Sequence, residues 1–459
     1  MKSNQKLRVI AAAGLALLIA VPAAAQDTHY WFDQFGNRAL LLSGAVVGEP
    51  ADLSAVYYNP GGLALAEQTE LLLAGLVLSV NGVQLIDAVA DGGDLSQSRF
   101  DVAPSLLAGE IPLSESRHRF AYSVMKRYGS SFLATGQADI EGIAFGLPVV
   151  ELLGNSLRVD SKLSEYWGGA TWSYPIRPDL GIGVTTFVAV RNQRRYATNN
   201  VQILTTGDRA AVGGMSTDYD YHHWRALWKI GAQGRFRDWN VGLTVTTPSV
   251  GLFGTGDLRN DLTIVSQLDT PEGPLTVIAN DAQLGVPADY RSPLSIAVGA
   301  GRAFGPTTLH VTAEYFAPLD AYTVIDGQPF VGQTGDGPFD TAIVEQLDSV
   351  LNVAVGVERR FREDLLAYFG FHTDFNAASD EPLANLSNTK WDFYHFSGGA
   401  TVSATGRSFT LGGELALASD TIAVSTGDPF EPLGAPAATQ ASAYKLTILL
   451  GFSFLAGGD

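Results

Sequence analysis

The last part of the chain alternates between large apolar side chains and smaller or polar ones. The even positions from Tyr444 to Phe454 are apolar, whereas the odd positions from Lys445 to Ser453 are mixed. Because successive side chains of a strand point to opposite faces of its sheet, this pattern predicts a strand with one apolar face. The same alternation occurs near 294–299, 309–315 and 351–358, so we expect most of the chain to be strand.

Fourteen segments can be assigned as strands, and from the third onward short turns alternate with long connections. The expected strands lie near 71–80, 99–108, 118–127, 162–174, 180–191, 218–234, 238–248, 289–303, 306–317, 348–360, 364–375, 391–403, 407–419 and 440–454. The expected long connections are 128–161, 192–217, 249–288, 318–347, 376–390 and 420–439. Transmembrane barrels have short periplasmic turns and longer outer loops. The sequence therefore predicts an all-β fold, a transmembrane antiparallel β-barrel of about fourteen strands.

The composition also favours a barrel in a membrane. The chain has 459 residues, of which 10% are aromatic and 17% charged, and it contains 50 Gly and 3 Met. The lipid-facing side of such a barrel must be apolar, but its lumen need not be. No run of about twenty apolar residues follows the first 25 residues, so no spanning helix is expected.

The first residues have the pattern of a secretory signal peptide. Lys2, Lys6 and Arg8 precede an apolar stretch over 9–21, and Ala23–Ala25 supplies the small residues of a cleavage site. We therefore expect residues 1–25 to be a leader, 26–70 an N-terminal segment and 71–459 the barrel. The chain has no Cys, which excludes a lipid-anchored lipoprotein and any disulfide.

The charge balance and the scattered histidines argue against several classes of function. The net charge is −18, or about −21 without the leader, and such acidity disfavours nucleic acid as a partner. No Gly-x-Ser-x-Gly elbow and no metal-ligand spacing occurs among the seven His. His395 and Ser397 share a strand face, but such pairs are common by chance. We expect no enzyme, no cofactor and no metal.

Residues 44–64 do not alternate and end in a distinctive motif around Asn59 and Pro60. They resemble the hatch segment of the long-chain fatty-acid transporter family (FadL type), which also includes aromatic-hydrocarbon uptake proteins. The matching positions are Asp52, Ser54, Ala55, Tyr57, Tyr58, Asn59, Pro60, Gly62 and Leu63. Gly61 stands where the family usually has Ala, a change expected to loosen the turn. Asn59, with its side-chain amide, is expected to bond backbone beside Pro60 and fix that turn.

The resemblance implies a fourteen-stranded barrel with residues 26–70 as a hatch inside it, and Asn59, Pro60, Gly61 and Gly62 as the hatch motif. It also implies that a hydrophobic molecule, such as a long-chain fatty acid, enters from outside and binds in the lumen. The molecule then leaves through a lateral opening in the wall, driven only by its concentration gradient. A monomer is implied as well.

By strand phase, four basic side chains should face the lumen and are candidate ligand-binding residues: Arg225, Lys229, His310 and Lys445. A cation inside the barrel can pair with a fatty-acid carboxylate. The alternative is that the charges inside the barrel pair with one another, for example Lys445 with Glu358 or Glu414.

Two other functions remain open at this stage. The barrel can be a scaffold or adaptor for a secretion or assembly machine, with its long loops as the docking surface. A hydrophilic porin is a further alternative, although its lumen should be open and strongly charged. In every case the partners expected are outer-membrane lipids and the barrel-assembly machinery, in a Gram-negative outer membrane. The sequence does not identify the ligand.

Overall fold

The computed structural model describes residues 28–66, 69–86, 95–113, 116–141, 150–205, 208–267, 274–379, 391–424 and 437–455. The expected leader, 1–25, lies outside these ranges.

The described residues form three short helices and eighteen strands. The helices are α2 (Asn37–Leu41), α3 (Ala55–Tyr58) and α4 (Pro60–Leu63). The strands are β1 (Thr69–Leu85), β2 (Leu95–Ile111), β3 (Arg119–Glu141), β4 (Val150–Arg177), β5 (Leu180–Thr205), β6 (Ala210–Phe236), β7 (Trp239–Thr246), β8 (Val250–Ser266), β9 (Leu275–Pro287), β10 (Ser295–Phe304), β11 (Thr307–Phe316), β12 (Leu319–Ile325), β13 (Ile343–Leu347), β14 (Val350–Arg362), β15 (Leu365–Asp374), β16 (Phe393–Ala404), β17 (Arg407–Val424) and β18 (Ala437–Leu455). No helix in the described ranges is long and apolar enough to cross a membrane.

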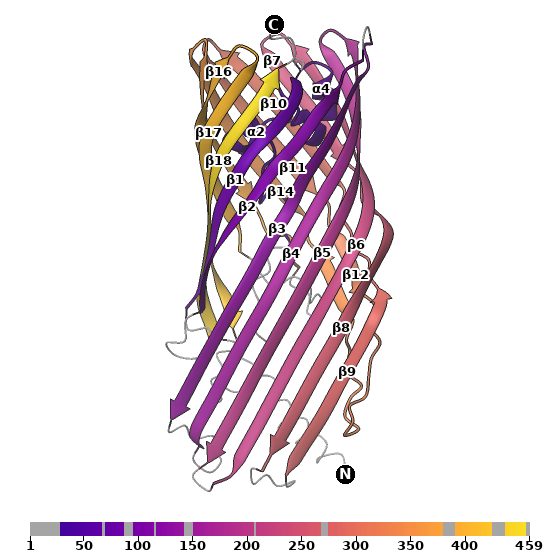
Figure 1. Cartoon of the computed structure of the whole chain (residues 1–459), viewed down its shortest axis with the longest axis vertical. Helices are drawn as coiled ribbons and strands as arrows, with labels where there is room; N and C mark the ends of the chain where they lie inside the picture. Colours follow the sequence, from indigo (N-terminus) through magenta and orange to yellow (C-terminus); the bar gives the residue numbers. More distant parts are fainter. Residues whose placement is uncertain are drawn as a thin grey trace.

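The strands close into an antiparallel barrel (Figure 1). Sixteen of them form one sheet, and β5 also pairs with β6. Without β8 and β9, which pair onto the far half of β6, the remaining fourteen form a closed ring. The ring closes where β1 meets β18, with Thr69 opposite Leu455. The predicted fold, an antiparallel transmembrane barrel of about fourteen strands, is confirmed.

Within the described ranges, five tight turns lie at one end of the barrel. Neighbouring strands there are joined at 178–179, 237–238, 305–306, 363–364 and 405–406. These turns lie at the upper end of Figure 1, where β18 also ends. The predicted short turns are therefore confirmed, and this end corresponds to the periplasmic side of a transmembrane barrel.

Four of the predicted long loops are wrong, because strands occupy much of them. β3 and β4 extend through 128–141 and 150–161, and β5 and β6 fill most of 192–217. The hairpin of β8 and β9 occupies most of 249–288, and β12 and β13 lie within 318–347. β4 alone has 28 residues, whereas crossing a bilayer takes about 9–11. As a result, β3–β6, β8 and β9 project far beyond the other strands (Figure 1).

The outward side chains show where the apolar band ends and the projecting sheet begins. Tyr166, Val188 and Ile230 are 46%, 38% and 53% exposed, which is expected for side chains that face lipid. Farther along β4 and β5, the exposed outward positions include Lys162 and Arg194, which lie opposite each other. The outward positions of this projecting part do not form a continuous apolar stripe that could face lipid. For this reason its strands resemble loops in the sequence.

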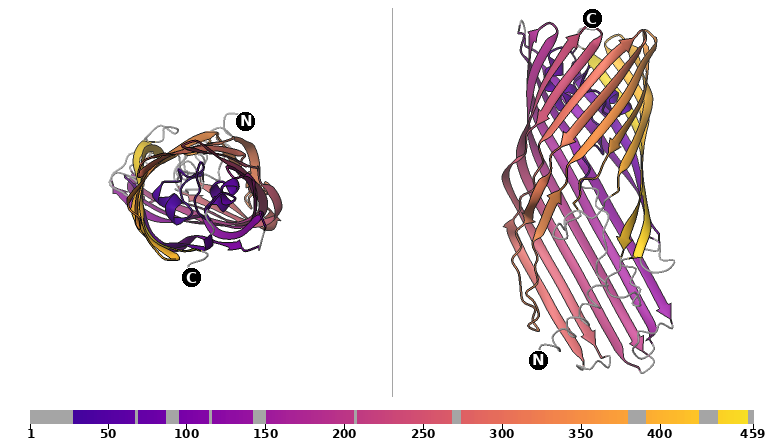
Figure 2. Two further views of the ribbon diagram at one scale, coloured as in Figure 1. Left: turned by 90° about the horizontal axis from the view of Figure 1, so that it is seen from above. Right: turned by 180° about the vertical axis from the view of Figure 1, so that it is seen from behind.

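Residues 28–66 (the luminal segment) lie inside the ring, as the view along the barrel shows (Figure 2). α2 contacts β15–β18, and α4 contacts β4–β6. Phe35, Leu41 and Leu53 of this segment are no more than 1% exposed. Burial of each large apolar side chain contributes about 1.5–3 kcal/mol, so the segment is held firmly against the inner wall.

Candidate functional site

The Asn59 side chain joins the luminal segment to the barrel wall. Its Nδ2 donates to the carbonyl oxygens of Val47, at 2.9 Å, and of Ala232 in β6, at 3.0 Å. Its Oδ1 accepts from the backbone N–H of Gly61 at 3.1 Å, which caps α4 behind Pro60. The amide therefore bonds the backbone beside Pro60 as expected, and a role for the turn as a gate remains a prediction.

The two glycines of the motif lie where the chain has no room for a side chain. A Cβ on Gly61 would lie 2.7 Å from the carbonyl oxygen of Gly231 and 2.8 Å from that of Gly181. A Cβ on Gly62 would overlap the ring of Pro50. The expectation that Gly61 loosens the turn is therefore corrected, because this glycine lets α4 approach the wall at van der Waals distance.

A cavity of about 70 Å³ lies between the luminal segment and the inner wall. Tyr30 and Tyr57 of the luminal segment cover one side of it. Its charged lining residues are Arg127, Glu165, Arg191, Arg225, Lys229 and Glu314. Two of the four predicted ligand-binding residues, Arg225 and Lys229, therefore lie in one site.

Glu165 of β4 joins two arginines, one from β5 and one from β6. Its Oε1 lies 2.7 Å from Nη2 of Arg225, and its Oε2 lies 3.2 Å from Nη1 of Arg191. The indole N–H of Trp167 also donates to Oε1, at 2.6 Å. Both guanidinium groups lie over the ring of Tyr290, at 3.7 Å for Arg191 and 5.1 Å for Arg225. One carboxylate thus serves two buried cations, and Tyr290 adds cation–π contacts.

Arg127 has no carboxylate partner in the described part of the chain. Its guanidinium lies over three aromatic rings, those of Phe35, Tyr57 and Trp167, at 5.5–5.8 Å. One of its N–H groups donates to the carbonyl oxygen of Tyr30. Arg127 follows an irregularity in β3, where the pairing with β4 slips between Lys126 and Tyr128, so this side chain turns into the lumen.

Lys229 is the other buried cation that lacks a carboxylate within 4.0 Å among the described residues. Its Nζ lies 4.3 Å from the ring centre of Tyr57. Burial raises the pKa of Tyr57 to about 12, so the phenol stays neutral and does not compensate the lysine charge. Glu314, which also lines the cavity, is held instead by the indole N–H of Trp31, at 2.8 Å, and by Ser295 Oγ, at 2.6 Å.

Two interruptions of the wall complete the cavity. The residues between β7 and β8 include Pro248, and those between β9 and β10 include Pro293. Because a proline has no backbone N–H, it cannot donate a hydrogen bond to a neighbouring strand. Thr246, at the end of β7, and Tyr290, before β10, line the cavity beside these breaks. The sequence gave no sign that Tyr290 would contact the two arginines.

His310 and Lys445 lie elsewhere in the lumen and do not line the cavity. Nη2 of Arg38 lies 3.3 Å from Nε2 of His310, which is 1% exposed. Lys445 Nζ lies 2.5 Å from a carboxylate oxygen of Asp33 and 2.8 Å from the carbonyl oxygen of Phe32. Both predicted residues therefore bind the luminal segment.

The suggested pairing of Lys445 with Glu358 or Glu414 is wrong. Glu358 Oε2 accepts from Nε of Arg38 at 2.6 Å, and Glu414 Oε1 lies 3.1 Å from Nδ1 of His395. Strand phase showed that these charges face inward. It did not show that the luminal segment supplies partners of its own.

Pairing between β2 and β3 is limited to one end of the two strands. Residues Leu106–Ile111 of β2 pair with Phe120–Met125 of β3, and the described residues show no backbone ladder beyond Met125. There the Gln97 side chain bridges the strands, bonding backbone atoms of Ser131 and Leu133. The wall therefore has fewer backbone hydrogen bonds at this seam than between β3 and β4, where β3 is paired along its whole length.

Solved structures of low sequence identity share this architecture. The Pseudomonas aeruginosa FadL homologue is 11% identical, with a TM-score of 0.59 over 93% of this chain and 99% of its own. The toluene transporter TodX of Pseudomonas putida is 13% identical, with a TM-score of 0.55 over 93% and 99%. The toluene transporter TbuX of Ralstonia pickettii is 13% identical, with a TM-score of 0.50 over 92% and 98%.

The chain has the fold of the FadL/TodX-type outer-membrane transporters. No protein-family model matches the sequence, and no curated protein sequence matches it either. The FadL-type fold predicted from residues 44–64 is thereby confirmed, and the expectation that the chain is not an enzyme agrees with these matches. At such low identity the likeness concerns the fold, and the function rests on the site.

Proposed function

We propose that the protein takes up hydrophobic molecules with an anionic headgroup, such as long-chain fatty acids, across a Gram-negative outer membrane. The observation that carries this proposal is the cavity between the luminal segment and the wall. Its lining contains four cations, Arg127, Arg191, Arg225 and Lys229, but only two carboxylates, Glu165 and Glu314. In a protein of net charge −18, this local excess of positive charge favours a bound anion.

The aromatic lining supports an apolar chain next to that anion. The rings of Tyr57 and Trp167 lie beside Arg127, and Phe316 stacks on Tyr30 with ring centres 4.1 Å apart. The cavity therefore has charged hydrogen-bond donors for a carboxylate and aromatic surface for a hydrocarbon chain. Ligand sites usually combine mostly apolar walls with a few well-placed polar groups.

The cavity volume implies that the ligand displaces part of the luminal segment. An engineered cavity of about 150 Å³ is needed to hold benzene in another protein, which is twice the 70 Å³ found here. Tyr30 and Tyr57 are the movable cover, since both belong to the luminal segment. In this proposal the segment acts as a hatch, and the concentration gradient of the ligand is the only energy source.

The seam between β2 and β3 offers an exit toward the membrane. Beyond Met125 the described residues link the two strands through side chains, with Gln97 bonded to Ser131 and Leu133 and Lys126 paired with Asp101, so separating the strands breaks no backbone ladder. A molecule that leaves sideways stays in an apolar phase and avoids the aqueous periplasm. The solved structures of the same fold include toluene transporters, which makes a neutral aromatic ligand the natural competitor to test.

The test compares binding of tritiated oleate and of toluene to the purified, lipid-reconstituted protein. We expect saturable oleate binding that falls about tenfold in Lys229→Met, because a charge-assisted hydrogen bond is worth about 1.5–3 kcal/mol. Toluene has no charge, so its binding should not change in this variant. Lys162→Met, on the outward face of the projecting sheet, is the matched control and should bind both ligands like the parent.

The competing function is that of a scaffold or adaptor. Its support is the sheet of β3–β6, β8 and β9, which stands beyond the other strands as a docking surface (Figure 1). A folded protein that binds neither oleate nor toluene would favour this alternative. Equal oleate binding by the parent and Lys229→Met would still support uptake of hydrophobic molecules, but it would show that Lys229 does not bind the anionic headgroup.

The proposal has two further parts. The protein is a monomer, which native mass spectrometry can measure, and it is inserted by the barrel-assembly machinery.

A further inference from the structure

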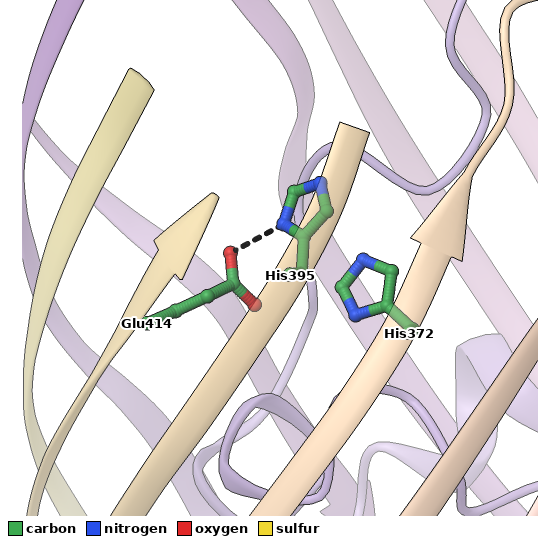
Figure 3. Close-up of side chains that lie close together, drawn as sticks. All are labelled: His372, His395 and Glu414. Atoms are coloured by element: carbon green, nitrogen blue, oxygen red, sulfur yellow. Dashed lines mark hydrogen bonds and ion pairs between the residues drawn. The ribbon is translucent and has the colours of Figure 1, made fainter. Parts of the chain in front are cut away.

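Two histidines and a glutamate from neighbouring strands form a cluster outside the cavity (Figure 3). His372 of β15 lies directly opposite His395 of β16, and Glu414 of β17 lies opposite Ser397, two positions farther along. The three side chains point to the lumen and are buried, at 0%, 0% and 4% exposure. One donor atom from each lies within 4.8 Å of the other two.

Each member of this cluster has a buried polar atom without a hydrogen-bond partner among the described residues. These atoms are Nδ1 of His372, Nε2 of His395 and Oε2 of Glu414. Buried polar atoms in native proteins nearly always have a partner, so the unpartnered Nδ1 of His372 and Oε2 of Glu414 in one cluster indicate a ligand. None of the three residues lines the cavity, and the proposed uptake does not use them.

The hydrogen bond of His372 prepares it as a metal ligand. Its Nε2 lies 3.2 Å from the carbonyl oxygen of Trp31. A carbonyl only accepts, so Nε2 carries the proton and Nδ1 keeps a free lone pair directed at the cluster. Metal-binding histidines usually donate their other ring N–H to a carbonyl or carboxylate in this way.

We infer that His372, His395 and Glu414 bind one divalent transition-metal ion, with Zn²⁺ as the best match. Zinc–nitrogen and zinc–oxygen bonds are about 2.0–2.2 Å long, so two donors of one tetrahedral ion stand about 3.3–3.6 Å apart. Small side-chain rotations close the present spacing of up to 4.8 Å to that range. Two imidazoles and one carboxylate suit zinc, whereas Ca²⁺ and Mg²⁺ prefer oxygen ligands alone.

The cluster contains one hydrogen bond between its own members, and this bond breaks when the ion binds. His395 Nδ1 and Glu414 Oε1 are 3.1 Å apart and share a hydrogen bond. When the ion coordinates both residues, the proton of this bond leaves His395 Nδ1 and is carried instead on the free Nε2. The imidazole is then a neutral ligand and the carboxylate is ionised.

The surroundings of the cluster do not oppose a cation. The nearby Lys445 has its charge compensated by Asp33, whose carboxylate is 2.5 Å from Nζ. The rings of His372 and His395 stack with centres 4.0 Å apart. Trp31 and Phe32 of the luminal segment pack against the two histidines and shield them from water. The ion would therefore fasten β15–β17 at the place where the luminal segment begins.

The test measures zinc bound to the full-length barrel. The protein is refolded in detergent with Zn²⁺, dialysed against metal-free buffer and analysed by elemental mass spectrometry. We expect close to one zinc per chain in the parent, and at least a fivefold loss in His372→Asn and in Glu414→Gln. His222→Asn is the matched control, because His222 is exposed on the outward side of β6, and it should retain the parent stoichiometry.

A second measurement needs no variant, in case a substitution prevents folding. Refolding with Co²⁺ in place of zinc should give the visible ligand-field bands of an ion bound by nitrogen and oxygen, and added Zn²⁺ should remove them. A parent without bound zinc and without cobalt bands would overturn the inference. Zinc retained equally by the parent, His372→Asn and Glu414→Gln would overturn it as well, because the metal would then sit elsewhere.

Discussion

The amide nitrogen of Asn59 lies 3.0 Å from the carbonyl oxygen of Ala232, a residue 173 positions farther along the chain. This bond ties the turn before α4 to the barrel wall near the end of β6. The same nitrogen donates to Val47, so the amide also holds two parts of the luminal segment together. This buried side chain therefore helps to fix the position of the segment over the cavity.

Asn59→Ala should lower the free energy of unfolding by about 2 kcal/mol or more. The substitution leaves the buried carbonyl oxygens of Val47 and Ala232 without their donor, and each such loss costs about 1–3 kcal/mol. Urea unfolding of the protein in lipid vesicles measures the change. A stability equal to that of the parent would show that water or another donor replaces the amide.

Gly61→Ala should displace α4 from the wall and destabilise the protein by about 1–3 kcal/mol, the usual effect of overpacking. The added Cβ would meet backbone atoms of Gly231 and Gly181, which cannot move aside as a side chain can. Gly168→Ala is the control, since a Cβ there has no atom within 4 Å. Limited proteolysis and urea unfolding of the two variants should differ, and similar behaviour would contradict the close packing of α4.

Glu165→Gln should destabilise the barrel by about 3–5 kcal/mol. It removes the carboxylate that contacts both Arg191 and Arg225, and so takes away a negative charge shared by two buried cations. Asp160→Asn provides the comparison, because Asp160 and Arg158 are half exposed and 3.7 Å apart. Such surface pairs contribute at most about 1 kcal/mol. A ranking in the opposite order would argue against the buried triad.

The end of the lipid-facing band can be located by cysteine labelling, because the chain has no Cys of its own. Val188 and Arg194 both point outward on β5, six residues apart along one strand. On intact cells a membrane-impermeant maleimide should label Arg194→Cys and leave Val188→Cys unlabelled. Both should react after unfolding in urea and detergent. Labelling of Val188→Cys on intact cells would mean that the lipid-facing band ends nearer to the tight turns than the structure suggests.

The sequence alone determined the strands of the ring and the tight turns at one end. Both follow from local patterns, namely the alternation of side chains along each strand and the residues of short turns. Strand phase also placed the side chains of Arg225, Lys229, His310 and Lys445 on the inner face. The motif around Asn59 indicated the FadL-type fold, although overall identity to solved structures of this fold is only 11–13%.

Only the tertiary structure decided which inward side chains meet. Arg225 and Arg191 share Glu165 because of the register between β4, β5 and β6, and Lys445 finds Asp33 because the luminal segment fills the barrel. The projecting strands were missed for a related reason, since their outward face meets water and carries no lipid-facing stripe. Alternation is a property of neighbouring residues, whereas pairing across the lumen depends on register and on the docking of a distant segment. Those contacts exist only once the barrel has closed.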